Sequence, residues 1–358
     1  MIRQQTCSHP VAVPERKTRS IKCVVWDLDN TLWHGILLED EHVTLRPGVV
    51  EVLETLDRRG ILLSIASRND RTTALRKLEE LGLKKYFLYP QINWEMKSAS
   101  LRAIAQALNI GIDTFAFIDD QSFEREEVHF AIPEVLCIDA EKIAEICALP
   151  EMMPRFLTDD SHRRRQLYQS DMERNDAEKE FTGSNDEFLA TLDMHFTIAR
   201  AQEEDLRRAE ELTVRTHQLN TTGYTYSYEE LNALRSSSTH KLFISGLEDK
   251  YGTYGKIGLT LIECQEDTWI VKLLLMSCRV MSRGVGTIMM NYIMHQAKQA
   301  NVRLLAEFIP NDRNRMMYIT YKFGGFTEVE RRDMLIVFEA NLAHIQPFPS
   351  YVTLHAEE

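Results

Sequence analysis

The sequence predicts an α/β protein with two domains, each built on a sheet whose strands alternate with helices. Three observations lead to this prediction. The chain has 358 residues, about twice the usual length of a single domain. Its composition is 44% apolar and 27% charged, which is typical of a globular protein and not of a disordered one. In both halves, short apolar runs alternate with segments that have a helical spacing of apolar residues.

The alternation is most regular from Ile21 to about Leu149. It predicts right-handed strand–helix–strand units and a parallel sheet. In such sheets ligands bind beyond the carboxyl ends of the strands. The predicted strands and helices are, in order, Cys23–Trp26, Val49–Arg58, Ile61–Ala66, Thr72–Leu81, Lys97–Leu108, Phe115–Ile118 and Val135–Ile138.

Pro150 and Pro154 mark the end of this unit, and the charged stretch Thr158–Glu180 that follows predicts an exposed helical linker. A second α/β unit begins near Asp193. Its predicted strands are Lys241–Ser245, Lys256–Glu263, Trp269–Met276 and Arg303–Phe308, with helices at Glu204–Arg215, Val285–Gln299 and Asn311–Tyr321. The expected division is a flexible tail over 1–20, a first domain over 21–155, a linker over 156–192, a second domain over 193–345 and a tail over 346–358.

The charge balance limits the classes of partner. Lysine and arginine number 42 and aspartate and glutamate 54, giving a net charge of −12, so the overall field disfavours nucleic acids and membrane surfaces. Residues 1–20 lack the apolar core of a signal peptide, and no apolar run approaches the roughly 20 residues of a membrane span. We therefore expect a cytoplasmic protein. Six scattered cysteines without a CxxC pair predict neither a disulfide framework nor a zinc site.

Two carboxylates, Asp27 and Asp29, follow the first strand. Where the chain turns at the end of a strand, side chains two residues apart can reach the same space. This pair suits phosphoryl transfer, in which one acid attacks phosphorus and the other protonates the leaving oxygen and then activates water.

Three later strand ends supply groups that would neutralise the phosphate. Ser67 can donate a hydroxyl hydrogen bond, Lys97 can provide an ammonium, and Asp119 and Asp120 can hold Mg²⁺ through hard oxygen ligands. The alternative is that these are ordinary cap and turn residues. Together with the two carboxylates that follow the first strand, the predicted Mg²⁺ ligands are Asp27, Asp29, Asp119 and Asp120.

The run Asp27-Leu-Asp29-Asn-Thr31, followed in order by Ser67, Lys97 and Asp119-Asp120, resembles the four motifs of the haloacid dehalogenase (HAD) phosphatases. The resemblance implies that Asp27 is the nucleophile forming an aspartyl phosphate, Asp29 the general acid and base, and Ser67 and Lys97 the phosphate ligands. It also implies a HAD-like Rossmannoid parallel sheet. The short connections between the motifs leave no room for a large cap domain.

In the second half, the strand Trp269–Met276 runs into a loop with Gly284 and Gly286 at the start of a helix. Such glycines expose main-chain N–H groups that bind phosphate. Together with Asn314, Tyr318 and the turn Gly324–Phe326, the loop resembles the acyl-CoA-binding loop of the GNAT acetyltransferases and implies a GNAT-like α/β domain. Met281 replaces the Arg or Gln usual in that family.

The same loop contains Cys278, a candidate nucleophile. Arg279, Arg283 and a following helix N-terminus would favour its thiolate, and the two arginines are candidate substrate ligands. The alternative is that Cys278 is a small buried hydrophobe. Cys23 is the rival thiol, but it lies four residues before Asp27 within a strand, which favours a place in the core.

Over about residues 20–340 the sequence resembles the FkbH-like family, through the stretches Lys22–Trp33, Phe117–Val128, Arg215–Gly223 and Ser277–Val285. The resemblance implies a bifunctional enzyme of polyketide biosynthesis. It would take the acyl group of 1,3-bisphosphoglycerate as a cysteine thioester, remove the remaining phosphate, and transfer the glyceryl unit to the phosphopantetheine thiol of an acyl carrier protein.

Two further features bear on this hypothesis. His217 replaces the Asn expected between Thr216 and Gln218, and it is either a base for the incoming thiol or, more commonly, a surface histidine. Arg163–Arg165 is a candidate docking patch for the acidic carrier protein. The alternatives are a Mg²⁺-dependent phosphatase with a non-catalytic second domain and a coenzyme A-dependent N-acyltransferase.

Overall fold

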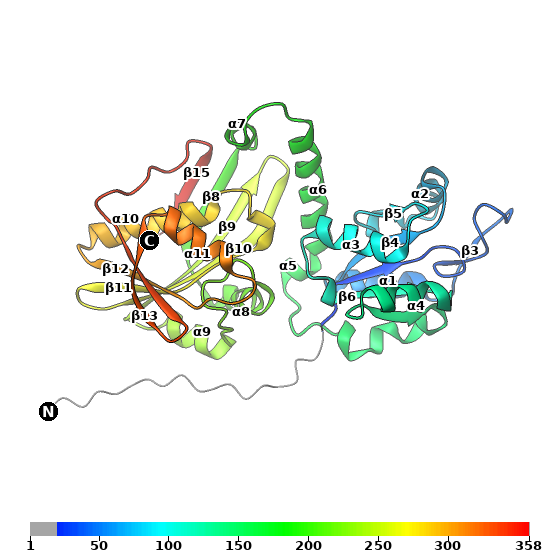
Figure 1. The fold of residues 1–358 in the computed structure, drawn as a ribbon, viewed down its shortest axis with the longest axis horizontal. Helices are drawn as coiled ribbons and strands as arrows, with labels where there is room; N and C mark the ends of the chain where they lie inside the picture. The colour runs from blue at the N-terminus through cyan, green and yellow to red at the C-terminus, as the bar shows by residue number, and fades with distance from the viewer. Residues whose placement is uncertain (1–19, 358) are drawn as a thin grey trace. The chain divides into compact units, whose positions relative to one another are not determined.

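A computed structural model describes residues 20–357 (Figure 1). Residues 1–19, which hold Cys7 and nearly all of the expected N-terminal tail, lie outside the described residues. The chain divides into two compact units, the first ending at Arg155 and the second beginning at Phe156. Within residues 20–357, no helix has both the length and the apolar character needed to cross a membrane.

The first unit contains the predicted parallel sheet. Its five strands have the order β5-β4-β1-β6-β7, and all pairs are parallel. The strand bounds are β1 Cys23–Trp26, β4 Leu62–Ser67, β5 Gln91–Ile92, β6 Phe115–Asp119 and β7 Leu136–Asp139. β1 and β6 are wholly buried because helices cover both faces of the sheet, which explains their continuous apolar runs.

The helices that connect these strands cover opposite faces of the sheet in pairs. α1 and α2 bury apolar residues such as Leu53 and Leu78 in one core with β1 and β4, while α3 and α4 pack against each other. The order of the strands reverses direction between β1 and β6, so the carboxyl ends of these two strands form the crevice where α/β sheets bind ligands. The bounds are α1 Val49–Arg58, α2 Arg71–Glu80, α3 Lys97–Leu108 and α4 Ser122–Ala131.

The first unit has no large cap among its described residues. The connection from β1 to α1 holds only a small hairpin, formed by β2 (Trp33–His34) and β3 (Thr44–Leu45). Short 3-10 turns complete the unit at η1 Lys84–Tyr86, η2 Ile112–Thr114, η3 Ala140–Ala148 and η4 Pro150–Met152. The expectation of a cap-free α/β domain is confirmed.

The second unit contains an eight-stranded sheet of order β13-β14-β12-β11-β10-β9-β8-β15. Its pairs are antiparallel except β11 with β12 and β8 with β15. The bounds are β8 Met194–Arg200, β9 His240–Asp249, β10 Gly252–Cys264, β11 Thr268–Met276, β12 Arg303–Phe308, β13 Phe326–Arg332, β14 Leu335–Ala340 and β15 Val352–Ala356. The prediction of a C-terminal tail over 346–358 is wrong in part, because β15 extends the edge of the sheet.

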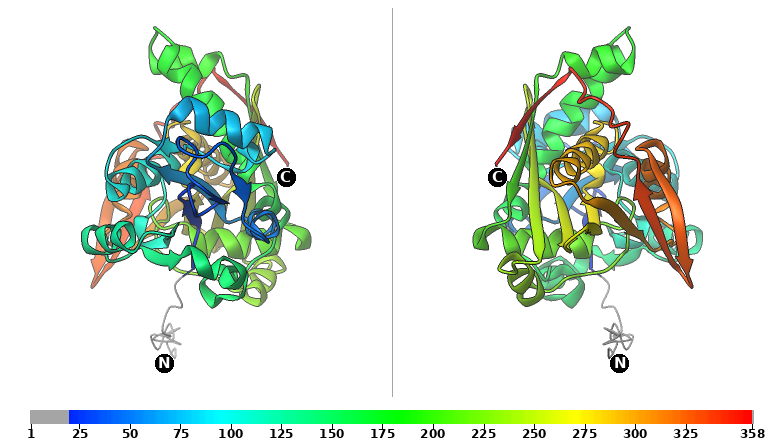
Figure 2. Two further views of the ribbon diagram at one scale, coloured as in Figure 1. Left: turned by 90° about the vertical axis from the view of Figure 1, so that its right-hand side faces the viewer. Right: turned by 90° about the vertical axis from the view of Figure 1, so that its left-hand side faces the viewer.

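Helices lie on both faces of this sheet (Figure 2). α8 (Leu206–Arg215) and α9 (Tyr228–Arg235) pack on one face, against β9, β10 and β11. α10 (Val285–Gln299) and α11 (Arg315–Phe323) pack on the other. The α/β class predicted for this half is therefore confirmed.

The stretch expected to be an exposed linker packs within the second unit instead. It forms α5 (Asp159–His162), α6 (Arg164–Glu180) and α7 (Asn185–Ala190). Arg174 of α6 is fully buried, donates 2.7 Å and 2.9 Å hydrogen bonds to the two carboxylate oxygens of Asp249, and stacks on the ring of Tyr254. The sequence prediction failed because the polar residues of α6 pair with other buried polar residues of the unit.

β11 and β12 pair only as far as Val271 and Ala306, and the segment Leu219–Thr221 fills the gap beyond. The main-chain oxygen of Leu219 accepts from the N–H of Met276 at 2.9 Å, and the N–H of Thr221 donates to the oxygen of Leu274 at 3.1 Å. On the other side, the N–H of Ile309 donates to the oxygen of Thr221 at 2.9 Å. The segment therefore ties the end of β11 to the end of β12.

Candidate active sites

The predicted phosphatase residues of the first unit converge at the carboxyl ends of β1, β4 and β6. Lys97, the first residue of α3, places its Nζ 2.5 Å from Oδ1 of Asp27 and 3.1 Å from Oδ2 of Asp119. The same Nζ donates to the main-chain oxygen of Ala66 at 2.8 Å. Lys97 is only 3% exposed, so its ammonium is held by the site and not by water. Three strand ends thus meet at one side chain.

Asp120 completes a group of three carboxylates. Oxygen atoms of Asp27, Asp119 and Asp120 lie within 4.8 Å of one another. Thr31 fixes Asp120, since its Oγ1 accepts from the N–H of Asp120 at 3.0 Å and lies 3.3 Å from Oδ1 of the same residue. Three hard oxygen donors at this spacing suit a divalent cation such as Mg²⁺.

The electrostatics favour bound positive charge. Burial, followed by the nearby carboxylate of Asp27, raises the pKa of Asp119 to about 7, although Lys97 partly opposes this. The same two causes raise the pKa of Asp120. Burial lowers the pKa of Lys97, but Asp27 and Asp119 outweigh burial and the net change is upward. One ammonium faces three carboxylates, so the donor set fits a metal ion.

Asp29 lies beside the cluster, but it is not among these three carboxylates. Its Oδ1 accepts from Nε1 of Trp33 at 2.8 Å and from the N–H of Leu37 at 3.1 Å, and its Oδ2 accepts from Nδ2 of Asn69 at 2.9 Å. Burial is the main cause that raises its pKa. Its carboxylate is therefore held by these three donors where it can keep a proton, and of the four predicted metal ligands it alone is outside the group of three carboxylates. The sequence reasoning missed Asn69, although it stands two residues after Ser67.

Ser67 is the last residue of β4 and is 3% exposed. It directly follows Ala66, whose main-chain oxygen accepts from Lys97. Its own main-chain oxygen accepts from the N–H of Asn93 at 3.1 Å, which fixes the strand end against the loop before α3. The structure thus places Ser67 next to the cluster that contains Asp27.

Cys278 lies in the second unit, at the end of β11. It begins the short 3-10 turn η6 (Cys278–Val280) and is half-buried. α10 begins seven residues later, with Gly284 as its N-cap at φ 72°. The predicted order of a strand, Cys278 and then a helix N-terminus is present, with the turn η6 between β11 and α10.

The two arginines predicted beside Cys278 have different environments. Nη1 of Arg283 lies 3.1 Å from Oε2 of Glu178, and the side chain is buried. Arg279 is half-buried, and its guanidinium lies 6.0 Å from the centre of the Tyr168 ring. Arg283 thus pairs with a carboxylate of α6, although its Nε, like Nη1 of Arg279, has no hydrogen-bond partner in the described structure.

His217 is exposed and lies just before the segment that pairs with the end of β11. Asn220 is opposite Leu275 in an antiparallel bridge, and Leu219 is opposite Met276. The pairing stops at Leu219 and Met276, two residues short of His217 and Cys278, because the chain turns at 218–219 and Cys278 begins η6.

Cys23 is fully buried in the middle of the first sheet, opposite Leu62 and Phe115. Burial raises the pKa of its thiol strongly, and a thiol held in its protonated form in the core is a poor nucleophile. The interpretation of Cys23 as a core residue agrees with this position.

The run Arg163–Arg165 does not form an exposed basic patch. Arg164 is 7% exposed and pairs with the buried carboxylate of Glu211. Arg163 is exposed, while Arg165 is half-buried and reaches Gln169 at 3.4 Å. The idea that all three arginines dock an acidic carrier protein is therefore wrong.

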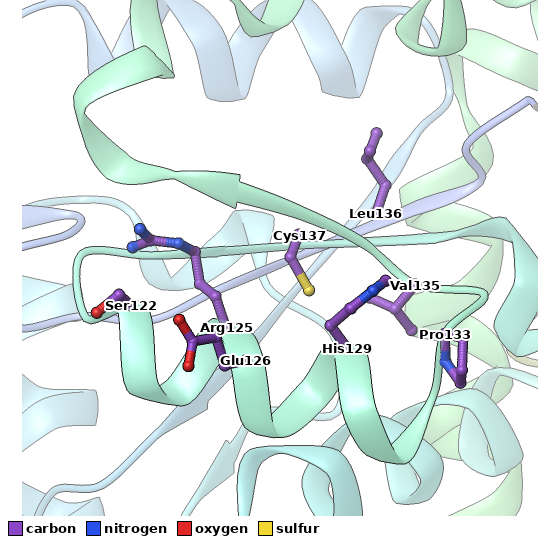
Figure 3. Close-up of a pocket in the computed structure, with 8 residues that line it drawn as sticks. All are labelled: Ser122, Arg125, Glu126, His129, Pro133, Val135, Leu136 and Cys137. Carbon is purple, nitrogen blue, oxygen red and sulfur yellow. The ribbon is translucent and has the colours of Figure 1, made fainter.

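An open hollow of about 450 Å³ lies between α4 and β7 (Figure 3). None of the predicted site residues lines it. Arg125 connects it to the back of the carboxylate site, since its guanidinium donates to the main-chain oxygen of Asp119 at 2.7 Å and pairs with Asp139 at 2.5 Å. The lining residues are Ser122, Arg125, Glu126, His129, Pro133, Val135, Leu136 and Cys137.

Comparison with protein families identifies residues 34–122 as matching the haloacid dehalogenase-like hydrolases. The matched range contains Ser67, Lys97, Asp119 and Asp120 and begins shortly after Asp29. The first unit therefore carries a HAD-like hydrolase domain, as the motifs at the strand ends predicted. No curated protein sequence matches the chain.

Solved structures resemble parts of the chain. The N-terminal part of a Bacteroides fragilis protein, containing a phosphatase domain complexed with Mg, is 29% identical, with 38% of this chain and 41% of that chain covered and a TM-score of 0.33. This chain thus spans about two fifths of that structure's length.

Other similar structures are N-acetyltransferases. The Escherichia coli ribosomal-protein-S18-alanine N-acetyltransferase is 14% identical, with 40% and 92% of the two chains covered and a TM-score of 0.33. A Thermoplasma acidophilum N-acetyltransferase in complex with coenzyme A is also 14% identical, with 40% and 98% covered and a TM-score of 0.33.

Proposed function

We propose that this chain is a bifunctional glyceryl transferase and phosphatase. The second unit takes the acyl group of 1,3-bisphosphoglycerate as a thioester on Cys278, and the first unit removes the remaining phosphate. The glyceryl unit then passes to the phosphopantetheine thiol of an acyl carrier protein. The observation that carries the proposal is the convergence of Asp27, Lys97, Asp119 and Asp120 at one sheet edge.

In the first unit, Asp27 attacks the phosphorus and forms an aspartyl phosphate. Lys97 holds Oδ1 of Asp27 and offsets the negative charge that nucleophile and phosphate bring together. Asp27, Asp119 and Asp120 would hold Mg²⁺, which supplies further neutralisation of the phosphate.

Asp29 is the general acid in this scheme. Its raised pKa lets it carry a proton to the leaving oxygen and then take one from the attacking water. Trp33 and Asn69 keep its carboxyl group in place through both steps. Its place outside the group of three carboxylates agrees with proton transfer better than with metal binding.

In the second unit, Cys278 captures the acyl group. An acyl phosphate is already activated, so a thiol displaces its phosphate without ATP. His217, exposed just before the segment that pairs with the end of β11, is the group that accepts the proton of the incoming carrier thiol in this scheme.

The rim of the first site fits a substrate carried by a protein. The loop before α3 exposes Trp94 and Met96, and the first turn of α4 exposes Phe123. These apolar side chains flank Lys97 and the pair Asp119-Asp120 in the sequence. Exposed apolar groups around an open catalytic site support docking of a macromolecule in place of a cap.

The test is a reconstituted transfer reaction with 1,3-bisphosphoglycerate, Mg²⁺ and a phosphopantetheinylated carrier protein, followed by intact-protein mass spectrometry of the carrier. We expect a glyceryl adduct with the natural chain, a phosphoglyceryl adduct or none with Asp27→Asn, and no adduct with Cys278→Ala. Glu39→Gln, an exposed carboxylate on the small hairpin, is the control.

The two alternatives give other results. A stand-alone phosphatase would release phosphate from free phosphoglycerates in the Cys278→Ala variant as fast as in the natural chain. A coenzyme A-dependent N-acyltransferase would bind acetyl-coenzyme A in calorimetry. Either result without a carrier adduct would reject the proposed transfer.

A further inference from the structure

A cluster of arginines surrounds one carboxylate in the second unit. Glu211 of α8 is fully buried and pairs with Arg164, with Nη1 of Arg208 at 2.8 Å and, more distantly, with Nε of Arg215 at 3.9 Å. Of these three arginines, Arg208 has a second carboxylate, Asp160, at 2.8 Å. Arg164 and Arg215 share Glu211, so the cluster retains an excess of positive charge.

The pKa values show this excess. Burial alone would raise the pKa of Glu211, but Arg208, Arg164 and Arg215 together lower it to about 2. Burial, followed by the positive charge of Arg215, lowers the pKa of Arg164 to about 9. Like charges that repel inside a protein bind an anion more readily than a balanced ion pair does.

The cluster lies within electrostatic range of Cys278, whose sequence neighbour Arg279 faces the ring of Tyr168 at 6.0 Å. The charge of a Cys278 thiolate would affect the pKa values of both Arg215 and the buried Tyr168. The charges of Arg279 and Arg164 also affect the pKa of Tyr168. These residues come from α6, α8 and η6, which the fold brings together at the end of β11.

Two guanidinium groups of the cluster are available to a ligand. Nη1 of Arg279 is buried and has no hydrogen-bond partner in the described structure, and the one carboxylate that acts on Arg279, Asp171, is hydrogen-bonded to Arg174. Arg215 is beyond hydrogen-bond distance of Glu211, and its side chain is 24% exposed. Buried guanidinium N–H groups normally find acceptors, and planar guanidinium groups match the oxygens of a phosphate.

We propose that Arg215 and Arg279 form a phosphate site beside Cys278 that binds the phosphoryl group displaced when the thiol is acylated. Arg164 holds Glu211 and adds to the positive field. The identity of the acyl phosphate rests on the proposed function, whereas the anion site itself does not. Arg283, which the sequence favoured as a second phosphate ligand, pairs with Glu178 and is not part of this site.

The step is balanced without a co-reactant. The sulfur of Cys278 attacks the acyl carbon, the C–S bond forms, and the bond between the acyl carbon and the bridging phosphate oxygen breaks. The thiol proton passes to the departing group, which leaves as hydrogen phosphate. Arg215 and Arg279 stabilise the charge that gathers on this group.

The test measures alkylation of Cys278 by iodoacetate and by iodoacetamide, with peptide mass spectrometry to separate it from the other cysteines. The probe ligand is inorganic phosphate, with chloride at equal ionic strength as the control. Relative to a small free thiol, we expect Cys278 to favour the anionic reagent by about fivefold or more, and phosphate to slow its alkylation.

Arg215→Gln and Arg279→Gln should each abolish this preference and the protection by phosphate. Arg215→Lys should keep both, which separates loss of charge from loss of structure, and circular dichroism checks that each variant folds. Arg163→Gln, an exposed neighbour of Arg164, should behave like the natural chain.

The proposed phosphate site is rejected if phosphate gives no more protection than chloride, or if both glutamine variants keep the reagent preference. This failure is distinguishable from failure of the proposed function. Acylation of Cys278 by 1,3-bisphosphoglycerate without phosphate protection rejects the phosphate site alone. Protection without acylation supports the site and rejects the acyl donor.

Discussion

The two units each contain a buried, unbalanced ionic cluster, and the two clusters have opposite signs. In the first, Lys97 faces Asp27, Asp119 and Asp120. In the second, Glu211 faces Arg164, Arg208 and Arg215. The first cluster suits a cation and the second an anion, because each leaves charge that its protein partners do not neutralise.

A third buried group shows an arginine whose hydrogen bonds are complete. Arg174 makes a bidentate pair with Asp249 and a further 2.7 Å bond to Asp171, and both ends of its guanidinium are satisfied. Arg174 holds α6 to the sheet, and its guanidinium group has no hydrogen-bond donor left for a ligand. The comparison indicates that unused hydrogen-bonding capacity, more than burial of charge itself, distinguishes a binding site from a structural ion pair.

The largest expected effect comes from Asp27→Asn. This near-isosteric change removes the nucleophile, so phosphate release should fall by more than about a thousandfold while the fold is kept. A colorimetric phosphate assay with Mg²⁺ measures it, and Glu39→Gln is the control. Residual activity within tenfold of the natural chain would contradict the assignment of Asp27.

Removing the carboxylate from each cluster should change stability in opposite directions. Glu211→Gln leaves three arginines without their shared partner and should destabilise the second unit by about 3–5 kcal/mol. Asp119→Asn relieves repulsion and should stabilise the metal-free first unit by about 1 kcal/mol.

Urea unfolding with EDTA, followed by hydrogen exchange of peptides from each unit, measures both changes. If the two substitutions shift stability in the same direction, the contrast between the clusters is wrong.

The two clusters should also respond to different pH ranges. Asp119 has a folded pKa of about 7 against an ordinary value of 3.8, so its protonated form is favoured by folding. Its contribution to stability is fully present below about pH 4 and is lost as pH rises through 7. The metal-free first unit should therefore lose stability between about pH 4 and 7, and Mg²⁺ should reverse the loss.

Tryptophan fluorescence during unfolding follows this effect, because Trp26 and Trp33 are buried in the first unit. The loss of stability of the metal-free first unit with rising pH should be absent in Asp119→Asn. Glu211 behaves oppositely: its pKa falls from 4.5 to about 2, so its contribution is present above pH 4.5 and is lost as pH falls toward 2. A second unit that keeps full stability at pH 3 would contradict this.

The smallest expected effect concerns the exposed rim of the first site. Trp94→Ala removes an exposed apolar side chain, so KM for a carrier-bound phosphoglyceryl substrate should rise about threefold with kcat unchanged. Steady-state kinetics with the carrier-bound and the free substrate measure the difference. Phe130→Ala, which alters an exposed apolar residue at the far end of α4, is the matched control.

That the residues of the first site lie together could be predicted from the sequence because they stand at successive strand ends, and a parallel sheet brings strand ends together whatever the rest of the chain does. Asn69 and Trp33 were missed, since their role depends on the side-chain direction of Asp29. The arginine cluster was missed because Arg164 and Arg215 meet only through packing of α6 on α8. The spacing of residues within one helix does not predict a side-chain contact between two helices. The charged residues of α6 instead led to the prediction of an exposed linker.

The division of labour between the units is tested most directly by intact-protein mass spectrometry of the enzyme itself after incubation with 1,3-bisphosphoglycerate and Mg²⁺. The account predicts a phosphoglyceryl adduct on Cys278 in Asp27→Asn, a glyceryl adduct on the same residue in the natural chain, and none in Cys278→Ala. An adduct on another cysteine, or the same adduct mass in Asp27→Asn and the natural chain, would contradict it.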